Sequence, residues 1–261
     1  MLARWTDPFL FVVVLGTGIL LILTGLLMVV GCGGKNPYEA NSFERAFYFY
    51  EKHKYHDAVQ ALEIFVRQNP TDSLAAKAQY FKAVSYVEIK EYPLAIVEFQ
   101  ILRKDFPTSE YVEDSYFQEG VAHLEQVGQV ERDITAAYDA RAVFNRLLIQ
   151  YPDSQHSTEA KDYLRKISDL IVLKRMKAAD VYRHLGRLDA VNLVLEQTLV
   201  QETQSSLLDE VLFRLAQNAE KRYLPQDALE AYERLLNEYP ESRRAGKAKS
   251  RLKKLKKAQE Q

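Results

Sequence analysis

Apolar and small residues recur at fixed distances before four prolines of this chain. Each proline follows an alanine by twelve residues, a large apolar residue by eight and another by five. Intervals of four and three place these positions on one helical face, and proline, which has no amide donor, then ends the helix. The sets are Pro70, Pro107, Pro152 and Pro240; Ala58, Ala95, Ala140 and Ala228; Leu62, Phe99, Phe144 and Tyr232; and Phe65, Leu102, Leu147 and Leu235. Serines just beyond the prolines are expected to cap the next helices, and these are Ser73, Ser109, Ser154 and Ser242.

The pattern resembles the tetratricopeptide repeat, a pair of antiparallel helices that stacks into a solenoid. The second unit fits best, with a turn around Lys90 and Glu91 and with consensus-like residues Ala76, Ala78, Tyr80, Ala83, Tyr86, Tyr92, Ala95, Phe99 and Pro107. A degenerate unit fills the gap after Pro152. Its small residues are expected at Ala178 and Ala190, with a turn at 184–187, and its final proline is missing.

The spacing of the second-helix alanines sets the number of units. Successive positions at Ala58, Ala95, Ala140, Ala190 and Ala228 lie 37, 45, 50 and 38 residues apart, against about 34 in the standard repeat. The excess predicts lengthened loops, above all around the third and fourth units. We therefore expect an all-α solenoid of about five helix-turn-helix units, closed by a capping helix over 243–261.

The amino-terminal segment predicts attachment of the protein to a membrane. An uncharged stretch from Phe9 to Gly31 precedes Cys32, the only cysteine of the chain, and a flexible glycine-rich segment follows it. The order Val-Val-Gly-Cys resembles a bacterial lipobox, which predicts acylation of Cys32 and cleavage of a signal peptide at Gly31. The stretch is also long enough to span a bilayer as an uncleaved helix, and this alternative stays open.

These features divide the chain into four parts. We expect a signal peptide over 1–31, a lipidated tether over 32–41, repeat units one to three over 42–155, and units four and five with the capping helix over 156–261. A membrane attachment through lipidated Cys32 would need the paired acyl chains of a lipoprotein, because one chain binds only marginally.

Charge and chemistry favour a binding scaffold over an enzyme. The formal net charge is −1, yet the segment after Ser242 carries nine Lys or Arg residues against one Glu, so the rest of the chain is acidic. The five histidines lie without a ligand set for a metal, and no phosphate-binding loop, nucleophile elbow or paired-cysteine motif is present. The sequence predicts no catalytic residue, no cofactor, no metal site and no nucleic-acid partner.

Two longer stretches resemble one family. They are Val130–Gln155, with an Arg-Asp-containing loop and a Tyr-Pro-Asp-Ser-Gln ending, and Tyr182–Asn192, with a glycine turn and an Ala-Val-Asn helix start. Together with the lipobox and the repeats they resemble the BamD family, also called YfiO or ComL, of outer-membrane β-barrel assembly lipoproteins. The resemblance implies a non-enzymatic, lipid-anchored protein on the periplasmic side of the cell outer membrane. It also implies binding to BamA, to other subunits of the assembly machine and to the carboxy-terminal strand of unfolded outer-membrane proteins.

The first-helix positions of units one to three predict a groove for such a peptide. They are apolar and often aromatic, as an extended peptide requires: Phe43, Phe47, Tyr50, Tyr80, Val84, Val87, Phe117, Val121 and Leu124. The corresponding positions of unit five are mostly polar: Glu210, Phe213, Gln217, Glu220 and Lys221. The alternative is that the aromatic residues fill the solenoid core.

Two other functions remain open at this level. One is a generic cell-envelope scaffold lipoprotein that shares the leader and repeats but does not bind BamA. The other is a scaffold on an uncleaved transmembrane helix, whose basic tail would contact anionic lipid or nucleic acid. In the assembly-machine interpretation the tail, beyond capping the last unit, is available to an acidic partner.

Overall fold

The computed structural model describes residues 36–127 and 133–259. Signal cleavage at Gly31, acylation of Cys32 and the bilayer-length stretch from Phe9 to Gly31 lie outside the described residues, as does most of the loop between the helices of unit three. Within the described ranges, no helix combines the length and apolar character needed to cross a membrane.

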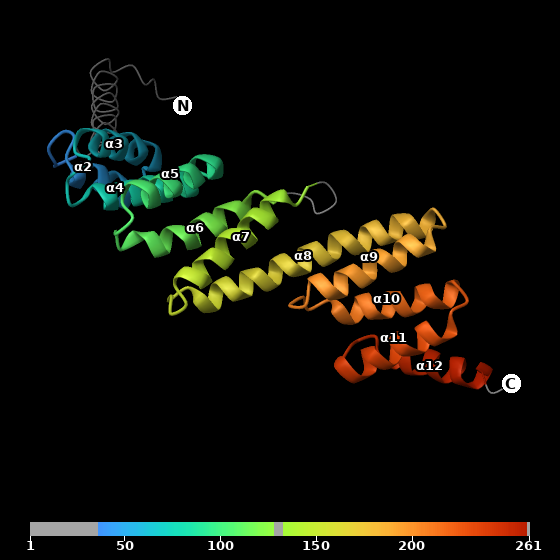
Figure 1. Ribbon diagram of the computed structural model, residues 1–261. Helices are drawn as coiled ribbons and strands as arrows, with labels where there is room; N and C mark the ends of the chain where they lie inside the picture. The colour runs from blue at the N-terminus through green and yellow to red at the C-terminus, as the bar shows by residue number, and fades with distance from the viewer. Residues whose placement is uncertain (1–35, 128–132, 260–261) are drawn as a thin grey trace, which may run out of the picture.

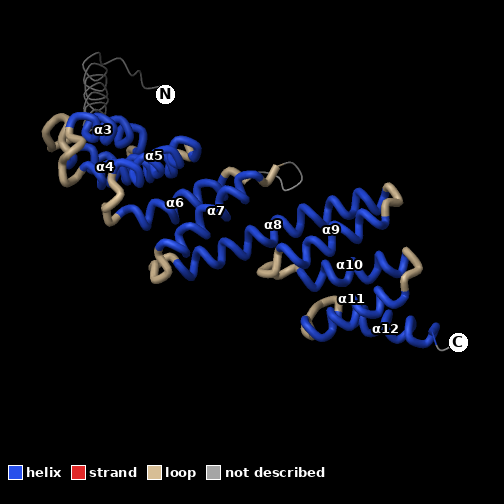
Figure 2. The backbone as a smooth tube through the Cα atoms, in the orientation of Figure 1, coloured by secondary structure: helices blue, strands red, loops and turns tan. Residues whose placement is uncertain are grey.

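The described chain forms five antiparallel helix pairs and one terminal helix, and no strand occurs in these ranges (Figures 1 and 2). The chain therefore has the predicted all-α tetratricopeptide architecture, and successive helices pack side by side. The pairs are α2 (Phe43–Glu51) with α3 (Tyr55–Gln68), α4 (Ala75–Glu88) with α5 (Tyr92–Asp105), α6 (Tyr111–Glu125) with α7 (Thr135–Gln150), α8 (Ser157–His184) with α9 (Leu188–Gln201), and α10 (Leu208–Lys221) with α11 (Pro225–Glu238), followed by α12 (Ala245–Gln259).

The predicted core positions are buried. The four alanines, the four large residues eight positions before the prolines and the four residues five positions before them all lie in the core. Helices α3, α5, α7 and α11 each end two residues before their proline. The small alanine lets the neighbouring helix approach, and the larger residues fill the space between the units.

The turns inside the units share one backbone feature. The middle residue of each three-residue turn is in the left-handed region, at His53, Lys90, Gly186 and Tyr223, with φ values of 55°, 62°, 70° and 58°. This conformation reverses the chain tightly after a helix, and glycine adopts it without steric cost. Unit three instead uses the longer connection between α6 and α7.

Three of the four predicted serines cap the start of the next helix, and the prediction for the fourth, Ser73, is wrong. The hydroxyls of Ser109, Ser154 and Ser242 each accept a hydrogen bond from the amide two residues ahead. In the first linker Asp72, not Ser73, accepts the bond from the Leu74 amide. A carboxylate at this position serves the same purpose because it offers an acceptor at the same reach.

Unit four corrects two expectations. Its long spacing comes from α8, a continuous helix of 28 residues, and not from lengthened loops. The buried small residues are also shifted by one position, to Ala179 and Val191 in place of Ala178 and Ala190. Val191, Leu195 and Thr198 then repeat the intervals of four and three seen in the other units. Val191 occupies the close-approach position where the other units have alanine, so a pattern of alanines does not mark this phase.

Helix α8 runs from beside α7 to beside α9 (Figure 1), and it contributes to two hydrophobic cores. Its first half packs Leu164 and Ile167 against α6 and α7, and its second half packs Val172 and Met176 against α9 and α10. The terminal helix α12 closes the second core with Ala248, Leu252 and Leu255. One helix thus ends the first three units and begins the fourth.

Candidate functional site

The first helices of units one, two and three carry the predicted peptide groove, and α4 lies against both α2 and α6. Two of the nine predicted residues belong to the core, because Phe43 is only 7% exposed and Phe117 only 6%. The other seven are half-buried and keep some surface for a ligand. They are Phe47, Tyr50, Tyr80, Val84, Val87, Val121 and Leu124.

The structure brings the residues of units one and two together. Phe81 contacts both Phe47 and Tyr50, with ring centroids 4.9 and 4.8 Å apart, and its neighbour Tyr80 stacks on Tyr111 at 4.9 Å. We call Phe47, Tyr50, Tyr80, Phe81 and Tyr111 the aromatic surface. Edge-to-face and stacked pairs of this kind hold their rings in fixed positions.

The remaining predicted residues form two separate groups. Val84 and Val87 pack with Tyr80 on the small core around Phe99. Val121 and Leu124 belong to the next core, together with α7 and α8. The structure therefore supports one continuous surface over units one and two that reaches Tyr111 at the start of unit three, and places Val121 and Leu124 apart from it.

Phe81 and Tyr111 were missed in the sequence. Adjacent helix residues point about 100° apart, so the choice of Tyr80 as the groove residue excluded Phe81. Tyr111 is the first residue of α6 and was hidden by the serine capping pattern before it. The doublet Tyr80-Phe81 was the available signal, since two large rings in succession on a first helix can contact both neighbouring units.

The tyrosine hydroxyls of this surface stay protonated. Burial raises the pKa of Tyr80, and the nearby Asp114, Tyr50 and Tyr111 raise it further. Burial also raises the pKa of Tyr50, with Tyr55 and Glu88 adding to the effect. The two phenols can therefore donate hydrogen bonds to a peptide backbone at any physiological pH.

Charged residues border the aromatic surface. Lys77 lies over the rings of Phe43 and Phe47, with its Nζ 5.5 and 5.2 Å from the ring centroids. A cavity of about 430 Å³ extends from Lys77 to Tyr111, and a second of about 390 Å³ is bordered by Glu110, Glu113 and Asp114. The arrangement offers apolar contacts flanked by one cation and by an acidic rim, which suits binding more than bond chemistry. In the described ranges, no three His, Cys, Asp or Glu residues are grouped to hold a metal ion.

Comparisons with known proteins match this architecture. The profile of the YfiO family, described as an outer membrane lipoprotein, matches residues 36–196, which is more than half of the 261-residue chain. A tetratricopeptide-repeat profile matches residues 210–242. The outer membrane protein assembly factor BamD of Caulobacter vibrioides is 21% identical over 198 residues, covering 72% of this chain and 65% of that protein. The chain thus spans just under two thirds of the length of this relative.

Solved tetratricopeptide structures superpose only loosely. TTC0263 of Thermus thermophilus is 17% identical with a TM-score of 0.35, covering 80% of this chain and 94% of that one. The MamA protein is 14% identical with a TM-score of 0.35, covering 74% of this chain and 86% of that one. The family match, in contrast, extends from the first described residue into α9. The chain belongs to the YfiO family of outer membrane lipoproteins.

Proposed function

We propose that the protein is a non-enzymatic lipoprotein subunit of the machine that assembles β-barrel proteins in the outer membrane. In this proposal the first half binds the carboxy-terminal strand of unfolded outer-membrane proteins, and the second half binds BamA. The family assignment and the assembly factor BamD among its relatives support it. The observation that supports the proposal most directly is the aromatic surface on the first helices of units one to three, in a chain of this family.

A strand peptide with an aromatic last residue suits this surface. Burying one aromatic side chain is worth roughly 1.5–3 kcal/mol, so two contacts account for about a hundredfold in affinity. Tyr50 and Tyr80 add hydroxyl donors for the peptide carbonyls. The protein supplies binding and orientation, and no covalent bond is made or broken.

Two substitutions test the peptide site, one at Tyr50 of the aromatic surface and one at Val84, which packs beside Tyr80. Tyr50→Glu combined with Val84→Glu places two charges that a bound peptide would desolvate without a partner. We expect about a hundredfold loss of affinity for a strand peptide in fluorescence anisotropy. The matched control is Tyr138→Glu with Val97→Glu, which changes the same residue types at exposed positions of α7 and α5.

The interpretation of this test depends on folding. Both double variants should retain the helical circular dichroism of the wild type. A melted Tyr50 and Val84 variant would place these residues in the core, and single Tyr50→Gln would then be measured instead, because it removes the ring without adding charge. Wild-type affinity in a folded variant contradicts the peptide site.

The second half exposes apolar residues at its helix turns. Leu185 in the α8–α9 turn and Tyr223 in the α10–α11 turn are 68% and 91% exposed, and Leu193 lies close by on α9. An open hollow of about 900 Å³ between the turns is lined in part by Leu188, Leu193 and Leu224. Exposed apolar residues gathered around a hollow are typical of a protein-binding surface, and we assign BamA binding to it.

Co-purification from gently solubilised membranes tests the partner. Leu193→Asp should lose BamA from the purified complex, whereas Val200→Asp, at another exposed position of α9, should retain it. Complexes that lack BamA even with the wild-type chain would favour the generic scaffold.

Acyl labelling tests the anchor independently. Cys32→Ala should abolish labelling and leave an uncleaved precursor, because cleavage follows acylation. Labelling that persists in the variant, or a wild-type chain that retains the stretch from Phe9 to Gly31, would favour the uncleaved helix.

A further inference from the structure

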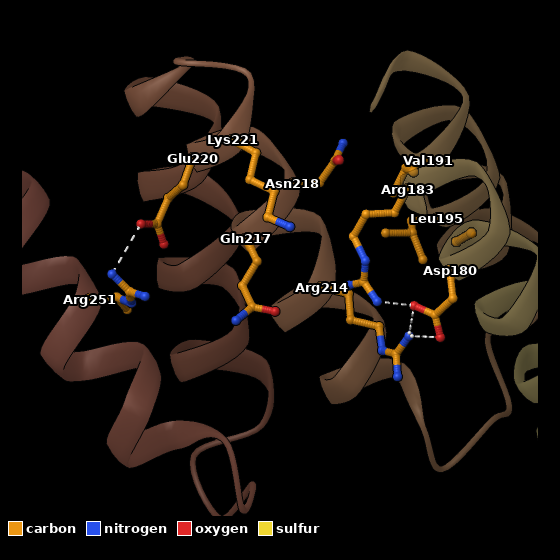
Figure 3. Close-up of a pocket in the computed structure, with 11 residues that line it drawn as sticks. Asp180, Arg183, Val191, Leu195, Arg214, Gln217, Asn218, Glu220, Lys221 and Arg251 are labelled. Atoms are coloured by element: carbon orange, nitrogen blue, oxygen red, sulfur yellow. Dashed lines mark hydrogen bonds and ion pairs between the residues drawn. The ribbon is translucent and has the colours of Figure 1, made fainter. Parts of the chain in front are cut away.

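The other half of the molecule offers a further candidate site, away from the aromatic surface. A cavity of about 320 Å³ opens between α8, α9, α10 and α12, within the usual size range of ligand pockets (Figure 3). Its apolar lining comes from Ala179, Val191 and Leu195. Four cationic side chains and only two carboxylates complete the lining: Arg183, Arg214, Lys221 and Arg251 with Asp180 and Glu220.

On one side of the cavity the charges are mutually satisfied. Arg214 donates through Nη1 to both carboxylate oxygens of Asp180, at 2.9 and 3.0 Å, and Arg183 donates to the same carboxylate. The Nε of Arg214 also donates to Glu210 at 2.9 Å. These contacts raise the pKa of Arg214 above its usual range, although burial alone lowers it. The charged side chains on this side therefore have their partners within the protein and are held in place.

The opposite side is incompletely paired. Glu220 accepts a hydrogen bond from the Tyr232 hydroxyl at 2.6 Å, but its ion pair with Arg251 is 3.6 Å long, beyond hydrogen-bond distance. Lys221 makes no hydrogen bond or ion pair within the described part of the chain. Figure 3 shows Lys221 and Gln217 between the two charged sides, with their polar ends toward the cavity.

A buried acceptor in the cavity wall lacks a partner. Asn218 is only 2% exposed; its Nδ2 donates to the Leu188 carbonyl at 2.9 Å, while its Oδ1 accepts no hydrogen bond. A buried amide oxygen without a donor is costly, so it points to a hydrogen-bond donor, such as a peptide N–H, that is supplied from outside the chain. Together with Lys221, Gln217 and Arg251, it makes the cavity an incomplete polar site.

We propose that this cavity binds a carboxylate of a partner polypeptide. Lys221 and Arg251 would pair with the carboxylate, and Gln217 would donate a hydrogen bond to it. A peptide N–H of the partner would donate to Asn218 Oδ1, and the adjoining apolar side chain would pack on Val191 and Leu195. A carboxylate fits better than a phosphate dianion because Asp180 and Glu220 flank the site and repel a second negative charge. The carboxylate can belong to a chain end or to an Asp or Glu side chain. This inference does not rest on the function proposed above.

Small peptides distinguish the two sources. The probes are acetyl-Ala-Leu-Phe with a free carboxylate, the same peptide as its amide, and acetyl-Ala-Glu-Leu-Phe amide. Each is titrated into the full-length protein and followed by NMR. We expect the free acid to bind at least tenfold more tightly than the amide. Tighter binding of the Glu-containing amide than of the plain amide would assign a side-chain carboxylate as a second acceptable source.

Charge-matched variants locate the site. Lys221→Gln and Arg251→Gln should each weaken binding of the free acid about tenfold, because each removes a charge-assisted hydrogen bond. Lys254→Gln makes the same charge change at an exposed position of α12 outside the cavity and should bind as the wild type. The Tyr50→Glu, Val84→Glu variant should also bind as the wild type, which separates this site from the aromatic surface.

Three outcomes overturn the proposal. They are equal binding of acid and amide, unchanged binding by Lys221→Gln and Arg251→Gln, and tighter binding of inorganic phosphate than of the free acid. All of these variants change exposed or half-exposed side chains, so the fold is expected to survive, and thermal denaturation confirms it.

Discussion

The two halves of the solenoid are stabilised by different side chains. In the described first half, Phe and Tyr rings contact one another from α2 to α8, and the only ring pair of the described second half is Phe213 with Tyr232. Ion pairs link helices in both halves, as Arg103 links α5 to α6, but in the second half they occur almost without ring contacts. Arg214 joins α10 to α8, Arg244 joins the start of α12 to α10, and Lys256 joins α12 to α11.

This difference matches the ligands proposed for each half. Ring surfaces accept many apolar sequences because their attraction is largely non-directional, which suits a protein that binds diverse unfolded chains. Ion pairs and exposed cations impose register and select a partner with complementary charges. The first half is thus suited to binding many different apolar sequences, and the second half to binding one specific partner protein.

The halves meet at a buried carboxylate. Glu202, 3% exposed, accepts hydrogen bonds from Arg141 of α7 at 2.7 Å and from Ser168 of α8 at 2.8 Å. It occupies the residue that follows α9, where the other units have Asn69, Phe106, Tyr151 and Tyr239. The degenerate unit without its proline therefore supplies the electrostatic link between the two cores.

The largest predicted effect is the loss of this link. Glu202→Ala leaves Arg141 and Ser168 without their acceptor and should cost about 3–5 kcal/mol, as for other broken buried ion pairs. We expect denaturant unfolding to separate into two transitions, because α8 would no longer couple the cores. Glu238→Ala, which breaks an exposed pair with Arg234, is the control and should cost under about 0.5 kcal/mol. A single transition with wild-type midpoint contradicts the coupling.

The next effect concerns the first half alone. A Cβ atom added at Gly120 of α6 would lie 2.6 Å from the Phe144 ring, which is fully buried. Gly120→Ala should therefore cost about 1–3 kcal/mol by overpacking. Gly246→Ala, where an added Cβ meets nothing within 4 Å, is the matched control and should be neutral or slightly stabilising. Hydrogen exchange should show faster opening around α6 and α7 and little change in α10 to α12.

A smaller effect concerns the pH dependence of stability in the first half. Burial raises the pKa of the Glu119 carboxyl, but the nearby His123, the charge of Arg103 and the hydrogen bonds from Gln100 and Arg103 outweigh burial and hold it below its usual value. The depressed pKa contributes stability that is present above pH 4.5 and is lost as the pH falls through the folded-state value. Thermal denaturation between pH 7 and 3 should therefore show a shallower acid loss for Glu119→Gln than for the wild type. An unchanged acid slope contradicts this assignment.

The sequence predicted the repeated core accurately and the departures from it poorly. Alanine, leucine and aromatic residues at intervals of three and four mark buried helix faces because burial depends on side-chain size and hydrophobicity. This pattern did not locate the buried positions of unit four correctly. Val191 replaces the expected alanine, and the long spacing reflects a 28-residue helix that no local pattern distinguishes from a helix with a loop.

The candidate site was predictable in outline only. The apolar bias of the first helices indicated the surface. The exposure of each ring depends, however, on which neighbouring helix covers it, and Phe43 and Phe117 are covered. Phe81 and Tyr111 enter the surface through contacts between units, which no single helix reveals. The cavity beside Asn218 joins four helices and could not be derived from any one of them.

The smallest predicted effect compares two turns with the same backbone. Lys90 in the first half and Tyr223 in the second both adopt positive φ, 62° and 58°, whereas unit four has Gly186 there. A left-handed conformation costs a side-chain-bearing residue about 1–2 kcal/mol. Glycine regains part of this but loses more chain entropy on folding, so Lys90→Gly and Tyr223→Gly should each stabilise by about 0.5–1 kcal/mol.

The two variants should differ in binding. Tyr223 is 91% exposed, so its ring contributes nothing to the core in return for the strained backbone. If this ring belongs to the BamA-binding surface, Tyr223→Gly should gain stability and lose partner affinity, while Lys90→Gly should gain stability and keep it. Thermal denaturation measures the first quantity and co-purification the second. Equal retention of BamA by both variants would remove Tyr223 from the surface and leave Leu185 and Leu193 to carry it.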